Sequence, residues 1–301
     1  MTRLAVVVFA FFVSSFLVAA EPAASVVDAN GKEVQLKNWR FTHGTRKLTW
    51  LTGAPEALAF RETSSTLYKD GVITLIPLDR LESLSYDSAK QLVAAKVAGI
   101  EKPLEGSIRY REINQVSLVA EVDKGADGVV ELTYKGGLLK GGVREIKLAN
   151  AKAGAKPEGN PMFVTIADGK QSLGTIAVHE LRALYRVDKG DEKPAPFLMF
   201  RKTYKLDLSQ IKRLAVHENA DSKTFECNVA LRDGTEQTLT LLNTITLDGK
   251  NAVLEGLIGV VPAGYKLFPF HTISELSLEE PKKEPEKKDE PGNSKSKPAT
   301  P

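Results

Sequence analysis

The sequence predicts an all-β protein: repeated antiparallel β units, forming small barrels or sandwich-like modules, joined by short one-turn helical links. Three observations support this prediction. Apolar and polar residues alternate with a period of two between residues 26 and 278, which is typical of half-buried strands. Asn-Gly and Asp-Gly dipeptides separate the alternating segments. An eleven-residue pattern of apolar positions also recurs along the chain.

Strands are predicted where the alternation is clearest, namely at Val34-x-Leu36, residues 72–78, 129–134 and 163–166, Val229-x-Leu231 and Leu239-x-Leu241. Hairpin turns are predicted at Asn30-Gly31, Asp70-Gly71, Asp127-Gly128, Asp168-Gly169, Asp233-Gly234 and Asp248-Gly249. In such dipeptides the glycine provides a positive φ and the Asx side chain caps the turn. Residues 88–97 include helix-favouring residues but also alternate, and we expect a strand there.

The recurring pattern is apolar at relative positions 0, 2, 5, 8 and 10. Full copies begin at Ile76, Ile108 and Phe268, and the copy from Leu206 differs only in having Ala215 between its apolar positions. Weaker copies begin at Leu138 and Ile176, where Lys140 and Arg186 occupy apolar positions. The spacings of the stronger copies lie near multiples of about 31 residues, which suggests a duplicated β unit.

The pattern also predicts a local structure. Positions 0 and 2 share one face of a strand, and positions 8 and 10 share one face of the next strand. Position 5 falls in a one-turn link between the two strands. We expect polar residues at positions 3 and 4, such as Ser209-Gln210, to begin this link. Their side chains can accept hydrogen bonds from the free backbone N–H groups at the start of a helical turn.

A strand ending at Ile76-Pro77-Leu78, a short turn and a closing strand from Ser83 to Tyr86 resemble the end of an SH3-like small barrel. The resemblance covers a short stretch of each copy and implies binding through loops and aromatic surfaces. It identifies no individual binding residue.

The length of the chain suggests several domains, since domains usually contain roughly 100 to 150 residues. We expect three β modules at residues 25–123, 124–219 and 220–278, either as separate units or as one continuous sheet. Residues 279–301 contain six lysines, six acidic residues and five prolines, with no apolar side chain larger than alanine. We expect a disordered, charge-balanced tail there.

The N-terminus has the three parts of a secretory signal peptide. Arg3 provides the positive start, an apolar run follows, and Val18-Ala19-Ala20 forms a small-residue cleavage site. We therefore expect residues 1–20 to be removed and the protein to be exported to the periplasm or outside the cell. The alternative is an uncleaved membrane anchor, the one membrane contact that we expect.

A single cysteine, Cys227, excludes an intramolecular disulfide, and its alternating neighbours place it on the inner face of a strand. The sequence also has no Asn-x-Ser/Thr glycosylation site. These two features favour a bacterial envelope protein.

Composition and motifs point to no catalytic chemistry. A net charge of +3 gives no reason to expect a nucleic-acid partner. The four histidines show no metal-ligand spacing, and the motifs typical of serine hydrolases and nucleotide-binding proteins are absent. We therefore name no catalytic, metal-binding or cofactor-binding residue and expect no cofactor.

One segment, residues 38–50, combines aromatic and basic residues and contains both tryptophans. It could be an aromatic core with a solvated basic face. It could also be a platform on which rings stack against sugars while arginines contact anionic groups. On the second interpretation the candidate binding residues are Trp39, Arg40, Phe41, His43 and Trp50.

Together these features predict an exported, non-catalytic β-repeat protein with a binding or structural role. Its expected partner is an envelope protein or a polysaccharide. The alternative is an enzyme on envelope polymers, similar to a glycoside hydrolase, whose carboxylates converge only after folding. A concave pocket with two facing carboxylates would favour the enzyme, and flat β surfaces would favour the binding protein.

Overall fold

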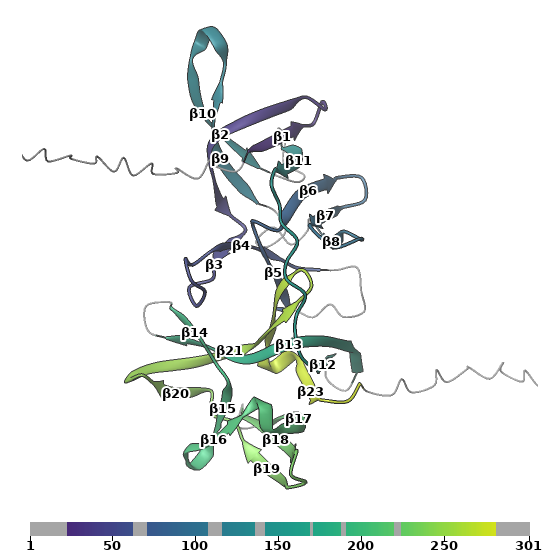
Figure 1. The fold of residues 1–301 in the computed structure, drawn as a ribbon, viewed down its shortest axis with the longest axis vertical. Helices are drawn as coiled ribbons and strands as arrows, with labels where there is room; N and C mark the ends of the chain where they lie inside the picture. The colour runs from purple at the N-terminus through teal and green to yellow at the C-terminus, as the bar shows by residue number, and fades with distance from the viewer. Residues whose placement is uncertain are drawn as a thin grey trace, which may run out of the picture.

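The computed structural model describes residues 23–62, 71–107, 116–135, 142–168, 171–187, 191–219 and 224–280. These residues form antiparallel strands joined by turns and by four one-turn 3-10 helices, so the predicted all-β class is confirmed. Figure 1 shows an elongated molecule with strands along its whole length. The predicted signal segment 1–20 lies outside the described residues, as does the predicted tail apart from Glu279 and Glu280.

An eight-stranded sheet forms the N-terminal half of the fold. Its strands, in spatial order, are β10 (Val129–Lys135), β9 (Ser117–Asp123), β2 (Glu33–His43), β1 (Ala24–Asp28), β11 (Val143–Leu148), β6 (Leu81–Asp87), β7 (Leu92–Val97) and β8 (Leu104–Ser107). The short helix η1 (Gly125–Asp127) lies in the β9–β10 hairpin. Alternate residues such as Val26, Leu84 and Leu118 form the buried core of this half, which we call the N-terminal core.

A bulge in β2 sets which of its residues reach the N-terminal core. The pairing of β2 with β9 shifts register between Lys37 and Arg40, and Asn38 has a φ of 47°. Leu36 and Phe41 are an odd number of residues apart, so a regular strand would place them on opposite faces. Because the bulge inserts one extra residue, both are buried in the same core.

A thirteen-stranded sheet forms the rest of the fold. Its order is β19 (Glu236–Thr240), β18 (Thr224–Leu231), β17 (Ile211–Asn219), β23 (Ile273–Ser277), β12 (Met162–Asp168), β13 (Gln171–Val187), β21 (Lys250–Val261), β22 (Gly264–Pro269), β5 (Ile73–Pro77), β4 (Glu56–Phe60) and β3 (Thr45–Lys47). Two further strands of this sheet lie outside that order: β14 (Glu192–Ala195) pairs with β13, and β20 (Thr244–Leu247) pairs with β21. A separate hairpin of β15 (Phe197–Phe200) and β16 (Tyr204–Asp207) encloses η2 (Arg201–Thr203).

Strands β4 and β5 join the two halves because one face of each strand packs into the N-terminal core and the other face packs into the other half. Leu58 and Phe60 of β4 pack into the N-terminal core, whereas Ala57 packs into a separate small core. All five residues of β5 are buried, and its nearly continuous apolar sequence is typical of a strand covered on both sides. The two halves of the molecule therefore share these strands.

Seven strands form a sheet that we call the closed sheet, in the order β14, β13, β21, β22, β5, β4 and β3. Its two edges, β3 and β14, are joined by side chains. Arg46 of β3 donates a hydrogen bond to Glu192 of β14, and the Glu192 backbone N–H donates to Thr49 Oγ1 at 3.5 Å. The small core inside consists of Leu48, Ala57, Ile73, Leu75, Leu184, Ile258 and Leu267.

The described copies of the eleven-residue pattern lie at strand corners. From Ile76 the chain leaves β5 of the larger sheet and enters β6 of the smaller one. From Leu206 it passes from β16 through η3 (Leu208–Gln210) to β17. From Phe268 it passes from β22, which pairs with β21 and β5, through η4 (Phe270–Thr272) to β23, which pairs with β12 and β17. Each copy marks a point where the chain changes its pairing partners.

Burial explains the spacing of the pattern. The residues at position 5 in these three copies, Leu81, Ile211 and Ile273, are at most 4% exposed, so each link turns its apolar residue inward. The prediction that residues at positions 3 and 4 cap the link is wrong for η3. The cap is Asp207 at position 1, whose side chain accepts a hydrogen bond from the Ser209 N–H at 2.8 Å. A duplicated β unit behind the pattern stays a prediction.

The weaker copy from Ile176 has no helical link. It lies within β13, whose first half pairs with β12 and whose second half pairs with β21. A register shift between His179 and Arg182, with Glu180 at a φ of 49°, bends the strand between these partners. The copies from Ile108 and Leu138 fall partly outside the described residues.

Strand pairing crosses the expected module boundaries at 123/124 and 219/220. β10 and β11 follow the first boundary but pair with β9 and β1, which precede it. β23 and β21 follow the second boundary but pair with β12 and β13. Antiparallel strands can pair with strands that are distant in the sequence, so local composition does not predict which strands share a sheet. The described strands therefore pair across both expected boundaries.

Several local predictions are confirmed. Of residues 88–97, where we expected a strand, 92–97 form β7 and 88–91 form a turn. The glycines of four predicted turns, Gly31, Gly128, Gly234 and Gly249, all have positive φ. Cys227 is fully buried in β18. Within the described part of the chain, no helix is long and apolar enough to cross a membrane.

Candidate functional site

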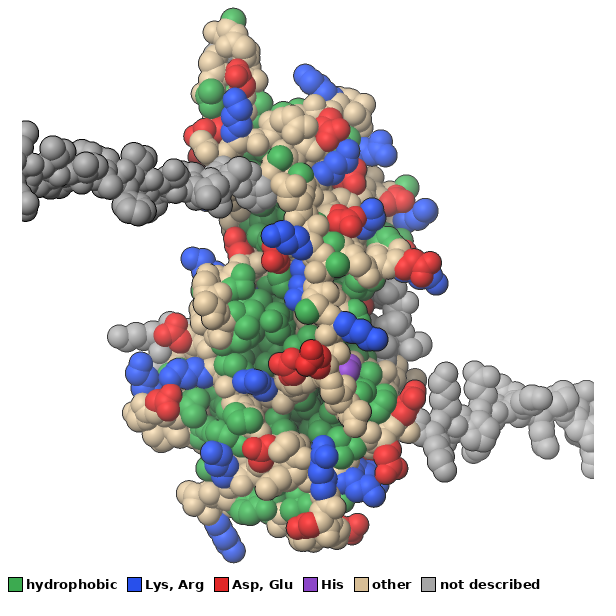
Figure 2. Space-filling view, in the orientation of Figure 1, with side chains coloured by type: hydrophobic (Ala, Val, Ile, Leu, Met, Phe, Trp, Pro, Cys, Tyr) green, Lys and Arg blue, Asp and Glu red, His purple; other side chains and the backbone are tan. Residues whose placement is uncertain are grey.

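A groove at one end of the closed sheet brings together residues from distant parts of the chain. It has a volume of about 160 Å³, close to the size of one sugar ring or one large side chain. We call it the aromatic groove, and it is lined by Trp50, Leu51, Glu180, Arg182, Pro194, Ile258, Gly259, Val260 and Tyr265. Figure 2 shows apolar side chains gathered between the β3–β4 hairpin and the strands β13 and β21, with charged side chains at the border.

The β3–β4 hairpin places Trp50 over the groove. Leu48 is fully buried in the small core and fixes the base of the loop. The loop is held by backbone hydrogen bonds from Leu48 N to Pro55 O at 2.9 Å and from Leu51 N to Leu48 O at 3.0 Å. Gly53, at a φ of 79°, allows the chain to turn back. Trp50 and Leu51 are partly buried and pack against the small core.

The opposite wall comes from three neighbouring strands. The bulge of β13 places Glu180 and Arg182 at the rim, and β21 and β22 contribute Ile258 and Tyr265. Burial raises the pKa of the Tyr265 hydroxyl, so this group remains a neutral hydrogen-bonding group at ordinary pH. The groove therefore combines two aromatic rings with one acidic and one basic side chain.

A group of four charged residues, which we call the charge cluster, lies at the other end of the small core. Arg182, Leu184 and Arg186 share one face of β13, so this strand runs from the groove through the core to the cluster. Arg46 donates to Glu192 and, at 2.9 Å, to Glu255 Oε2. The second oxygen of Glu255 lies 3.3 Å from Arg186 Nη1.

The two carboxylates of the charge cluster are not equivalent. Burial raises the pKa of Glu192, and this effect exceeds the opposing effect of the neighbouring Arg46. Glu192 Oε2 is buried and, among the described residues, has no hydrogen-bond partner. Glu192 and Glu255 both contact the same arginine, so the cluster satisfies most of its own charge.

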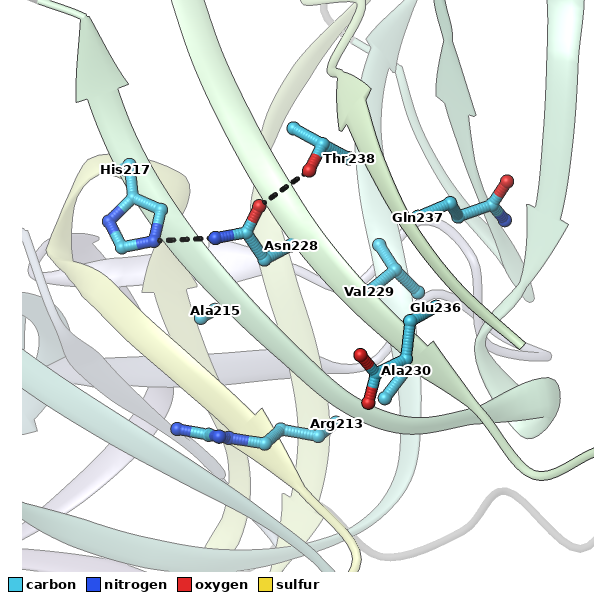
Figure 3. A pocket seen from close by; sticks show the side chains of 9 residues that line it. All are labelled: Arg213, Ala215, His217, Asn228, Val229, Ala230, Glu236, Gln237 and Thr238. Atoms are coloured by element: carbon cyan, nitrogen blue, oxygen red, sulfur yellow. Dashed lines mark hydrogen bonds between the residues drawn. The ribbon is translucent and has the colours of Figure 1, made fainter. Parts of the chain in front are cut away.

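A second surface, which we call the polar sheet face, lies over β17, β18 and β19. It is a shallow depression of about 650 Å³ lined by Arg213, Ala215, His217, Asn228, Val229, Ala230, Glu236, Gln237 and Thr238. Figure 3 shows Asn228 between His217 and Thr238. The Asn228 side-chain nitrogen lies 3.2 Å from His217 Nε2, and its oxygen accepts the Thr238 hydroxyl at 2.8 Å. Arg213 is paired with Glu275 at 2.7 Å.

The five candidate residues from the sequence do not share one surface. Trp39 and Phe41 form an edge-to-face pair with ring centroids 5.5 Å apart and pack against the N-terminal core. Arg40 is exposed and lies 3.8 Å from Glu131. His43 is exposed at the end of β2, and only Trp50 lines the aromatic groove.

Sequence reasoning missed Arg46 as a structural residue and Tyr265 as a groove residue. Arg46 lies within the segment that we singled out, but its partner Glu192 is 146 positions away. Tyr265 follows the turn between β21 and β22, where nothing in its neighbourhood indicates a groove. No local pattern could have joined Tyr265 to Trp50.

Metal ligation is not supported by the side-chain arrangement in the described ranges, since no three His, Cys, Asp or Glu residues there are grouped to hold an ion. Comparison with known proteins adds no relative, because no family model, no curated protein and no solved structure matches the chain. The resemblance to SH3-like barrels therefore stays a prediction.

Proposed function

We propose that this is an exported, non-catalytic protein that binds a polysaccharide of the cell envelope in the aromatic groove. The observation that carries the proposal is the placement of Trp50 and Tyr265 in one groove of about 160 Å³. Sugar rings have apolar faces that stack on aromatic side chains, while their hydroxyl groups hydrogen-bond to polar groups at the rim. Glu180 and Arg182 offer an acceptor and donors at that rim.

The rigidity of the groove supports binding. Both walls belong to the closed sheet, and the loop that carries Trp50 is anchored by the buried Leu48 and by its own backbone hydrogen bonds. A preformed site loses little conformational entropy when a ligand binds. Export rests on residues 1–20 and is part of the proposal.

One observation favours the enzyme as a second candidate. Glu192 is a buried carboxyl group with a raised pKa, a property typical of general acids. However, Arg46 contacts both Glu192 and Glu255 and lies between them, where a glycosidic bond would have to bind. The geometry therefore favours the binding protein.

Tryptophan fluorescence tests the proposal directly because the chain has two tryptophans. In a Trp39→Phe variant, Trp50 is the only reporter, and we expect peptidoglycan fragments or a neutral polysaccharide to quench its emission saturably. In the matched Trp50→Phe variant, Trp39 remains as reporter and should not respond. A flat titration of the first variant across a broad glycan panel, or an equal response in both variants, would contradict the proposal.

A further inference from the structure

The outer edge of β10 is the feature from which we infer a second interaction surface. β10 pairs with β9 through seven consecutive residues, Val129 to Lys135, with no register shift. Among the described residues, no strand pairs with its other side. Figure 1 shows the β9–β10 hairpin projecting from one end of the molecule. An unpaired strand edge presents N–H and C=O groups that can pair with another strand.

Three other strand edges in the described structure carry features that discourage pairing. The edge of β3 is joined to β14 through Arg46 and Glu192. β14 contains Pro194, which lacks an N–H donor. β8 is short and forms an isolated bridge from Gly106 to Glu62. β10 has neither a proline nor a bulge, and its first residue, Val129, is 56% exposed.

The sequence of β10 is complementary to itself when two copies run antiparallel. With Thr133 opposite Thr133 of the second copy, Glu131 lies opposite Lys135 and Leu132 lies opposite Tyr134. Each of these contacts occurs twice because of the two-fold symmetry. Opposite charges and apolar pairs directly across antiparallel strands are favourable.

The two faces of β10 fit this register. Glu131, Thr133 and Lys135 are exposed, so their pairs would form on the solvent side. Leu132 and Tyr134 are partly buried against the N-terminal core, so their pairs would extend that core across the junction. A register centred on Leu132 would instead place Lys135 opposite Val129 and Glu131 opposite Thr133, so neither would face an opposite charge across the junction.

We propose that two copies of this protein associate by antiparallel pairing of their β10 strands around Thr133. The two eight-stranded sheets then form one continuous sheet across a two-fold axis. A single pair of short strands buries less surface than the roughly 1,200 to 2,000 Å² of a standard stable interface. The dimer is therefore weak and forms at high protein concentration.

Charge exchange on the full chain tests the proposal by sedimentation. We expect the unaltered protein to show a concentration-dependent dimer. Glu131→Lys places like charges opposite each other twice, as does Lys135→Glu, and each should weaken dimerisation at least tenfold. The double variant, or an equimolar mixture of the two single variants, restores opposite charges and should restore the dimer.

The charge-exchange experiment can overturn the proposal in two ways. An unaltered protein that stays monomeric at millimolar concentration would contradict it, and so would a failure of both the double variant and the mixture to recover dimerisation. Because Glu131 and Lys135 are exposed, circular dichroism should show that all variants fold.

Cross-linking checks the register independently of charge. The one native cysteine, Cys227, is buried, so an introduced cysteine becomes the only accessible thiol. Thr133→Cys places two sulfurs across the axis at a separation that a disulfide can span. We expect it to form a covalent dimer on mild oxidation, whereas Thr238→Cys, exposed on the polar sheet face, should not. Equal cross-linking of the two variants would contradict the register.

Discussion

Arg46 and Glu192 are 146 positions apart in the chain, yet their side chains join the two edges of the closed sheet. Backbone pairing holds every other neighbouring pair of strands in this sheet. At this edge the fold uses an arginine that also binds Glu255. The residues that complete the sheet are thus charged, although they lie beside a small apolar core.

Removing Arg46 should destabilise the protein. In Arg46→Ala two largely buried carboxylates, whose side chains are 11% and 19% exposed, would lose the cation that contacts both of them. Arg186 would remain, paired with Glu255 alone. We expect the free energy of unfolding to fall by about 2 kcal/mol. Chemical denaturation measures this change, and Arg40→Ala is the control. The ion pair of Arg40 with Glu131 is exposed, so Arg40→Ala should lower the free energy of unfolding by less than about 1 kcal/mol. Equal effects of both substitutions would contradict this role of Arg46.

The raised pKa of Glu192 predicts a pH dependence. In the folded protein this group binds a proton more readily than in the unfolded chain, where its pKa is near 4.5. Its contribution to stability is therefore fully present below pH 4.5 and is lost as the pH rises through the higher folded value. Relative to Glu192→Gln, which does not titrate, the unaltered protein should become less stable as the pH rises through this window. Denaturant titrations across it measure the difference, and the opposite slope would exclude a raised pKa.

Burial raises the pKa of the Cys227 thiol to about 12. Because the thiolate is the reactive form, we expect negligible reaction with a thiol reagent in the folded state and complete reaction in denaturant. Thr238→Cys provides an exposed comparison on the neighbouring strand, and its added thiol should react within the mixing time. Rapid labelling of the native Cys227 would show that β18 opens readily.

The corner residues should differ in their contribution to stability according to burial. Ile211 is fully buried at the start of β17, whereas Leu181 is only partly buried at the bend of β13. We expect the free energy of unfolding, measured by chemical denaturation, to fall by about 3 kcal/mol in Ile211→Ala and by about 1 kcal/mol in Leu181→Ala. Lys212→Ala, at an exposed neighbour, is the control and should have little effect. A larger loss for Leu181→Ala would contradict the assignment of Ile211 as the main anchor.

If the protein is exported, its signal segment should be removed. When the full chain is produced in a bacterium with an outer membrane, we expect it in the periplasm, beginning at Glu21. N-terminal sequencing together with the intact mass measures this directly. Recovery of exported or membrane-bound material that begins at Met1 would instead support the anchor.

Local properties of the sequence determined the all-β class, four described hairpin turns, the burial of Cys227 and the corners at Ile76, Leu206 and Phe268. All of these depend on residues within a few positions of one another, because side chains alternate along a strand and glycine permits positive φ. Tertiary structure alone decided that Trp39 packs against a core whereas Trp50 lines a groove. Both lie in the same aromatic and basic segment. Trp39 lies in β2, which pairs with β9 around the bulge at Asn38, whereas Trp50 lies in the loop of the β3–β4 hairpin. The contact of Arg46 with Glu192 and the meeting of Trp50 with Tyr265 depend on how the sheet closes, which no local pattern specifies.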